Sequence, residues 1–124
     1  MLTKRYKIAD GSIVITVPSE VSQNVAKRAV LISQQAHVPV LGVIENMGQF
    51  TCPDCGEAVG ILQSGGGEKL ARDMEVEYWG SIPMDLGVSS SLDHGKPFVL
   101  EDDDFIGTKI VMTAAKKLIE RFEK

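Results

Sequence analysis

The sequence predicts an α/β fold built on a parallel sheet, and three observations support this fold class. Residues 12–17 and 40–45 are runs rich in β-branched residues without polar alternation, which is typical of strands covered on both faces. A stretch with helical periodicity separates them, so the segment has the length of a βαβ unit. At 124 residues the chain is long enough for one compact domain but not for two. We therefore expect a single α/β domain over 1–124.

The first βαβ unit has a recognisable helix start and stop. Ser19 follows the strand 12–17 and can cap a helix over 19–36. That helix should end before Pro39, because a residue that precedes proline avoids the helical conformation. The strand 40–45 comes next. Apolar residues at three- and four-residue spacing give the helix one apolar face, formed by Val21, Val25, Ala29 and Ile32.

The second half of the chain predicts one more strand and two helices. A short helix over 67–74 opens after a triple glycine, and a strand over 77–82 follows it. The clearest helix is 102–123, since Asp102, Asp103 and Asp104 at its start and basic residues at its end complement the helix dipole. Its apolar stripe should cover one face of the sheet and consists of Ile106, Ile110, Ala114, Leu118 and Phe122.

The charge pattern argues against two classes of partner. The formal net charge is −4 and the Lys and Arg residues are scattered, so the basic patch of a nucleic-acid or anionic-membrane binder is missing. The sequence has no apolar run of about 18 residues or more, and residues 1–6 lack the apolar region of a signal peptide. We expect a cytoplasmic protein that binds neither nucleic acid nor membrane.

The two cysteines, Cys52 and Cys55, lie in the loop 50–57 with the motif C-P-x-C-G. Pro53 favours a tight turn, and Gly56 tolerates the left-handed backbone that directs N–H groups at sulfur, so both thiolates can face one metal. A redox pair is one alternative, although such a pair normally opens a helix, and two inert thiols are another.

Two thiolates leave a four-ligand site half complete. Structural zinc takes four ligands, and iron–sulfur clusters commonly take four thiolates. A second copy related by a two-fold axis would supply the missing pair, and such dimers are the commonest oligomers. The cysteine count therefore favours a homodimer that shares one metal site. Two cysteines completed by other ligands are the alternative.

Ligands of open α/β sheets bind outside the carboxyl ends of the strands, and three segments leave those ends here: 18–20, 45–47 and 83–85. Asn46 offers an amide that can donate to and accept from a purine edge, beside apolar contacts from Met47 and Pro83. The alternative is that Asn46 serves only the turn after its strand.

The glycines at 65–67 are not a Walker A motif, which requires G-x-x-x-x-G-K-[ST]. The one Gly-Lys pair, Gly95-Lys96, is followed by Pro97. We interpret 65–67 as permitting a sharp helix start, with anion binding as the weaker alternative.

Four ordered motifs, covering about residues 10 to 100 with their flanks, resemble the Mrp/ApbC family of iron–sulfur cluster carrier ATPases. These proteins are MinD/ParA-like P-loop NTPases with a deviant Walker motif. The motifs are VLGVIENM at 40–47, CPDCG at 52–56, GGGEKL at 65–70 and GSIPMD at 80–85. The resemblance implies a partial parallel-sheet P-loop NTPase fold of the three-layer, Rossmann-like type, corresponding to the C-terminal half of such an ATPase.

By this resemblance, Cys52 and Cys55 would bind a labile iron–sulfur cluster, of the [4Fe-4S] type, that bridges two chains. Asn46 would recognise the nucleobase of ATP in the complete family protein, with Pro83 and Asp85 in the adenine-side loop. The implied partners are a second copy of the chain and iron–sulfur acceptor or scaffold proteins.

The sequence also departs from the family. Gly48 stands where the family often has serine, and neither a Walker A lysine nor a Walker B aspartate segment occurs. Phosphoryl transfer needs a phosphate cradle, a lysine and a magnesium-holding acid, so we expect no ATP hydrolysis by this chain alone. An uncovered sheet edge should favour self-association.

The sequence therefore predicts an iron–sulfur carrier module. The alternatives are an interaction domain with structural zinc, and half of a nucleotide-dependent enzyme completed by a longer chain or a subunit.

Overall fold

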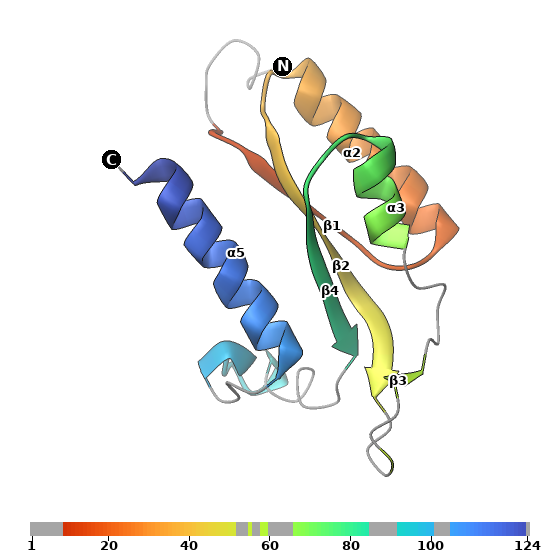
Figure 1. The fold of residues 1–124 in the computed structure, drawn as a ribbon, viewed down its shortest axis with the longest axis vertical. Helices are drawn as coiled ribbons and strands as arrows, with labels where there is room; N and C mark the ends of the chain where they lie inside the picture. Colours follow the sequence, from red (N-terminus) through yellow and green to blue (C-terminus); the bar gives the residue numbers. More distant parts are fainter. Residues whose placement is uncertain are drawn as a thin grey trace.

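The computed structural model describes residues 9–51, 55, 58–59, 66–84, 92–100 and 105–123. Within these residues a four-stranded sheet lies between two layers of helices (Figure 1). Helices α2 (Glu20–Gln35) and α3 (Gly66–Asp73) cover one face, and α5 (Ile106–Phe122) covers part of the other. The predicted α/β class with a parallel sheet is confirmed.

The sheet has the order β1-β2-β4, with all three strands parallel. Its strands are β1 (Ser12–Thr16), β2 (Val40–Thr51) and β4 (Tyr78–Met84). A two-residue strand, β3 (Ala58–Val59), pairs antiparallel with the far end of β2. β2 is the central strand and continues six residues past the predicted end at 45, because β4 and then β3 keep its backbone paired. The predicted strand 77–82 corresponds to β4.

Helix α2 begins as the sequence predicts. Ser19 is its N-cap, and the Ser19 hydroxyl accepts a hydrogen bond of 3.2 Å from the Ser22 N–H. The buried face, however, is formed by Ala26 and Val30. The apolar face expected from residue spacing is exposed, and its members are Val21, Val25, Ala29 and Ile32. Two apolar stripes run along this helix, and only packing decides which one meets the sheet.

The core lies between the sheet and helices α2 and α3. Its cluster of buried residues consists of Val14, Ala26, Val30, Val43, Leu70 and Ala71. The eight residues of α3 correspond to the predicted helix 67–74 and contribute Leu70 and Ala71 to this cluster. A helix this short is stable only when it is packed against other elements.

Helix α5 packs on β4. It begins at Ile106, four residues later than predicted, with Phe105 as its N-cap, and Asp102–Asp104 lie outside the described residues. Of the predicted stripe, Ala114 is buried, Ile110 and Leu118 are half-buried, and Ile106 and Phe122 are exposed. A short 3-10 helix, η1 (Phe98–Leu100), precedes α5.

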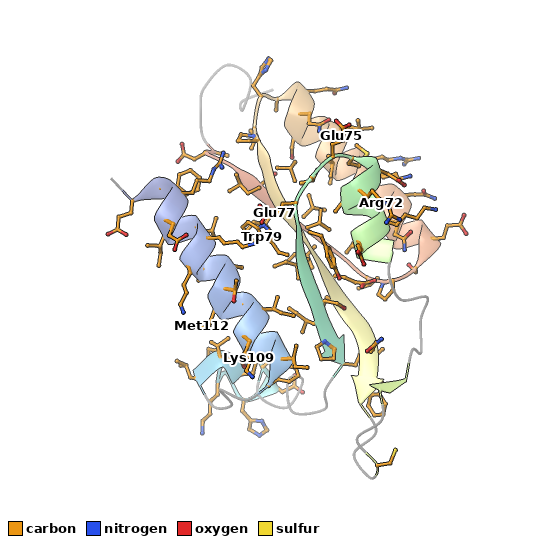
Figure 2. All side chains as sticks on the ribbon, in the orientation of Figure 1. Arg72, Glu75, Glu77, Trp79, Lys109 and Met112 are labelled. Carbon is orange, nitrogen blue, oxygen red and sulfur yellow. The ribbon has the colours of Figure 1, made fainter. Side chains whose placement is uncertain are left out.

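A polar contact ties α5 to β4. Lys117 donates a hydrogen bond of 2.7 Å to Glu77 Oε1, and its Nζ lies 5.0 Å from the centre of the Trp79 ring. Figure 2 shows Glu77 and Trp79 close together on the side of β4 that faces α5. The Lys117 ammonium, and to a smaller extent the Trp79 indole, lowers the pKa of Glu77 below its ordinary value. Among the described helices, none is long and apolar enough to cross a membrane.

Candidate functional site

The carboxyl ends of β1, β2 and β4 lie at one edge of the sheet because these strands are parallel. Thr16 of β1 is in register with Glu45 of β2, and the next residue of β2, Asn46, is in register with Ile82 of β4. Segments that leave neighbouring strands therefore gather at this edge, where open parallel sheets bind ligands.

Asn46 and Pro83 are brought together by this register. Pro83 follows Ile82, the strand partner of Asn46, and is half-buried, whereas Asn46 is exposed. Asp85, the third residue predicted for a nucleotide site, lies outside the described residues. The base-contact role of these residues stays a prediction.

The backbone at Asn46 is irregular. Between Asn46 and Phe50, β2 advances four residues while β4 advances two, from Ile82 to Met84. Met47 has a positive φ of 58°, and its N–H donates a hydrogen bond of 2.9 Å to Asn46 Oδ1. The two extra residues of β2 form a bulge, and the side-chain oxygen of Asn46 stabilises it through this hydrogen bond. The amide nitrogen of the same side chain is a donor that an incoming ligand can use.

Glu45 is a buried acidic residue whose burial the sequence did not predict. Its side chain is 2% exposed, and its Oε1 accepts a hydrogen bond of 3.4 Å from the Gly67 N–H in the first turn of α3. Burial first, and the neighbouring Glu45 carboxylate second, raise the pKa of Tyr78. The sequence feature that indicates its burial is its position as a single acidic residue directly after the apolar run 40–44.

The glycines at the start of α3 have a packing role. A Cβ at Gly67 would lie 2.8 Å from the Glu45 Cβ, so only glycine lets α3 approach β2 this closely. The Glu45 carboxylate also occupies the position at the helix N-terminus that a bound anion would need. These contacts favour the helix-start interpretation of 65–67 over phosphate binding.

The cysteine motif falls, in the sequence, between two strands that pair antiparallel, β2 and β3. Thr51 of β2 pairs with Ala58 of β3, so the two ends of the intervening segment 52–57 are held together across an antiparallel pair. Antiparallel partners have Cα atoms about 4.5–5.5 Å apart. Cys55 is exposed and is not in a disulfide, and Cys52 lies outside the described residues.

Cys55 is the one residue of the motif that the structure describes. Within the residues that the structure describes, no group of three or more His, Cys, Asp or Glu side chains is arranged to hold a metal ion.

The architecture and the site's location define a MinD-like P-loop NTPase fold. The MinD cell division protein of Aquifex aeolicus matches with a TM-score of 0.65 at 20% identity, over 90% of this chain and 44% of that one. A nucleotide-binding protein from Archaeoglobus fulgidus, in complex with ADP, matches with a TM-score of 0.62 at 32% identity, over 70% of this chain and 36% of that one.

A family model identifies the chain more specifically than its fold does. A family model described as ParA, NUBPL iron-transfer P-loop NTPase, matches residues 2–119, and the chain belongs to this family. The resemblance to iron–sulfur carrier NTPases inferred from the sequence motifs is thereby confirmed.

Two curated relatives show how much of the family protein is covered. The chain is 39% identical over 118 residues to the iron-sulfur cluster carrier protein of Methanocaldococcus jannaschii, covering 92% of this chain and 39% of the relative. It is 35% identical over 111 residues to the cytosolic Fe-S cluster assembly factor NUBP2 of Mus musculus, covering 90% of this chain and 40% of the relative. The chain thus spans about two-fifths of the length of these relatives.

Proposed function

We propose that this chain is the cluster-binding part of an iron–sulfur cluster carrier, with the cluster as its cargo and Cys52 and Cys55 as its ligands. The observation that carries the proposal is a C-P-x-C pair in a member of an iron-transfer NTPase family, in the segment between the paired strands β2 and β3, with Cys55 exposed. Solvent-reachable thiolates can pass a cluster to an acceptor protein, whereas a buried site would retain it.

A second copy of the chain would complete the ligand set. Each copy offers two cysteines, and a [4Fe-4S] cluster commonly takes four thiolates. A two-fold axis through the cluster would bring the two cysteine motifs together. The proposed partners are a second copy and the scaffold or acceptor proteins that exchange the cluster.

Asn46 and Pro83, with Asp85, form the proposed contact to the base of ATP. Asn46 on β2 lies beside Ile82 and Pro83 of β4, and this adjacency supports the assignment for Asn46 and Pro83. Phosphate binding and hydrolysis would require residues that this sequence does not contain, so the chain alone is proposed to lack ATPase activity. The name of the mouse relative supports a cytoplasmic setting.

Anaerobic reconstitution with iron and sulfide tests the proposal. The expected product contains four irons per two chains, absorbs in the visible region and has the mass of a dimer. Cys52→Ser and Cys55→Ser should each abolish iron retention and the dimer together. Gln49→Ser, at an exposed residue of β2 close to the motif in sequence, is the matched control and should retain both.

Two results would refute the cluster assignment. One is iron retention that is unchanged in both cysteine variants. The other is tight binding of zinc with no visible absorbance after reconstitution, which would identify a structural zinc site in its place.

A further inference from the structure

Glu45 is a buried side chain that neither the proposed cluster site nor the proposed base contact uses. It is 2% exposed, and it is the only acidic or basic side chain that is buried within the described ranges. No Lys or Arg side chain of those ranges forms an ion pair with it. A buried carboxyl group without a cation stabilises a fold less than an apolar residue of similar size would. A role other than core stability is therefore the better explanation for Glu45.

The two side-chain oxygens of Glu45 face two different segments. Oε1 accepts a hydrogen bond of 3.4 Å from the Gly67 N–H in the first turn of α3. A Cβ at Gly48 would lie 3.5 Å from Oε2, so the backbone of the β2 bulge lies beside the second oxygen. Both neighbours are glycines at close approaches, since a Cβ at Gly48 would also collide with Ser81 Oγ. The side chain is thus enclosed between the bulge of β2 and the start of α3.

Strand β4 borders the same side chain. A Cβ at Gly67 would lie 3.4 Å from Tyr78 Cε1, so the Tyr78 ring packs beside the contact between Glu45 and α3. The raised pKa of Tyr78, caused first by burial and second by the Glu45 carboxylate, agrees with this proximity. Glu45 therefore lies where β2, β4 and α3 meet.

The bulge and the start of α3 flank the part of the chain that carries the proposed cluster ligands. After β2, the chain contains Cys55 and β3 and continues into α3. In the described part of the chain, β3 is held to β2 by two residue pairs, Phe50–Val59 and Thr51–Ala58. So short a pairing is marginally stable by itself. The position of this segment therefore depends on how firmly α3, which follows it, is held to β2.

We propose that Glu45 is a positioning residue of the cluster site, which holds the start of α3 against the bulge of β2 and so fixes both ends of the segment that carries Cys55. The inference rests on the proposed function, because the cluster is what this segment would bind. Loss of the cluster requires its ligands to move away from it, and local opening of this kind is rarer when both ends of a segment are fixed. Glu45 thereby sets how long the carrier retains its cargo.

The test measures iron loss from the anaerobically reconstituted chain after addition of excess EDTA, followed by visible absorbance. Glu45→Met removes the hydrogen-bond acceptor but fills the space, and it should lose iron about three- to tenfold faster, the factor that one hydrogen bond contributes. Glu45→Gln keeps an oxygen that can accept from the Gly67 N–H, so it should lose iron at the rate of the unsubstituted chain. Gly67→Ala, whose Cβ would lie 2.8 Å from the Glu45 Cβ, should push α3 away and accelerate iron loss as Glu45→Met does.

The matched control for global stability is Val30→Ala, at a core residue of α2 that has no part in this contact. It should lower the urea midpoint and leave the rate of iron loss unchanged. If Glu45 served only as a cap that stabilises the fold, iron loss would instead follow global stability, and Val30→Ala would accelerate it as much as Glu45→Met.

Hydrogen exchange of the iron-free chain gives a second readout that needs no cluster. In Glu45→Met, the backbone amides of the β2–β3 pair should exchange faster than in the unsubstituted chain, whereas those of β1 and α2 should not change. In Glu45→Gln, all of these amides should exchange as in the unsubstituted chain.

Two results would overturn the inference while the proposed function stands. One is equal rates of iron loss, with equal exchange at β3, in Glu45→Met and Glu45→Gln. The other is iron loss that follows the urea midpoint across all the variants. A chain that retains no iron at all would instead refute the proposed function, and the cluster role of Glu45 with it, so the two failures are distinguishable.

Discussion

Substituting two valines of α2 by alanine tests which face of this helix is buried. Val30 is 0% exposed and belongs to the core cluster, whereas Val25 is 60% exposed on the same helix. Val30→Ala removes two methyl groups from the core, which costs about 1.6 kcal/mol in transfer free energy. The cavity left behind adds about 1 kcal/mol, so the total loss of stability is about 2–3 kcal/mol.

Val25→Ala should change the free energy of unfolding by about 0.5 kcal/mol or less, since the side chain is mostly in water and alanine is the better helix former. The measurement is urea unfolding followed by circular dichroism at low protein concentration. With a slope of about 1–3 kcal/mol per molar urea, a loss of about 2–3 kcal/mol in Val30→Ala should lower the midpoint by about 0.7–3 M. Equal losses for the two variants, or a larger loss for Val25→Ala, would show that α2 is not oriented as described.

Three further predictions concern polar groups. Ser19→Ala should destabilise the protein by about 1 kcal/mol in urea unfolding, because the first turn of α2 loses its cap. Glu45→Ala should cost about 2–4 kcal/mol in the same assay, since a void forms and the Gly67 N–H loses its acceptor; an unchanged midpoint would contradict the buried contact. The pKa of Glu77 is lowered, so its ion pair with Lys117 stabilises the fold at pH values above the ordinary Glu pKa of 4.5. For so exposed a pair the stabilisation is about 0.5 kcal/mol, and it is lost as the pH falls below 4.5. Lys117→Met should remove this part of the acid dependence of the melting temperature, and an unchanged acid dependence would show that the pair does not contribute.

The elements that local chemistry dictates could be predicted from sequence. The run 12–17 has no polar alternation and forms β1, and Ser19 caps α2 as its hydroxyl chemistry predicts. The end of α2 before Pro39 follows from the restriction that proline places on its neighbours. These features depend on residues close together in the chain.

The parts of the site that depend on distant contacts could not be predicted. The bulge after Asn46 arises because the register between β2 and β4 shifts there by two residues. A register shift depends on both strands, so the sequence of one strand cannot predict it. Glu45 is buried only because the glycine-rich start of α3 lies against it, 22 residues further along the chain. Phe50 belongs to a strand and not to a loop because Val59 pairs with it.

The sequence by itself determined the parallel α/β class and the cysteine pair, because each depends on residues close together in the chain. It also determined the family, because the four motifs and their order can be read without the fold. Tertiary structure alone decided that the stripe of α2 with Ala26 and Val30 faces the sheet, whereas the stripe with Val21 and Val25 is exposed. It also decided that Asn46 borders a groove between β1 and α2. The physical reason is that both stripes are hydrophobic enough to be buried. The side chains of β1, β2 and α3 pack against only one of them, so contacts with distant residues determine which stripe is buried.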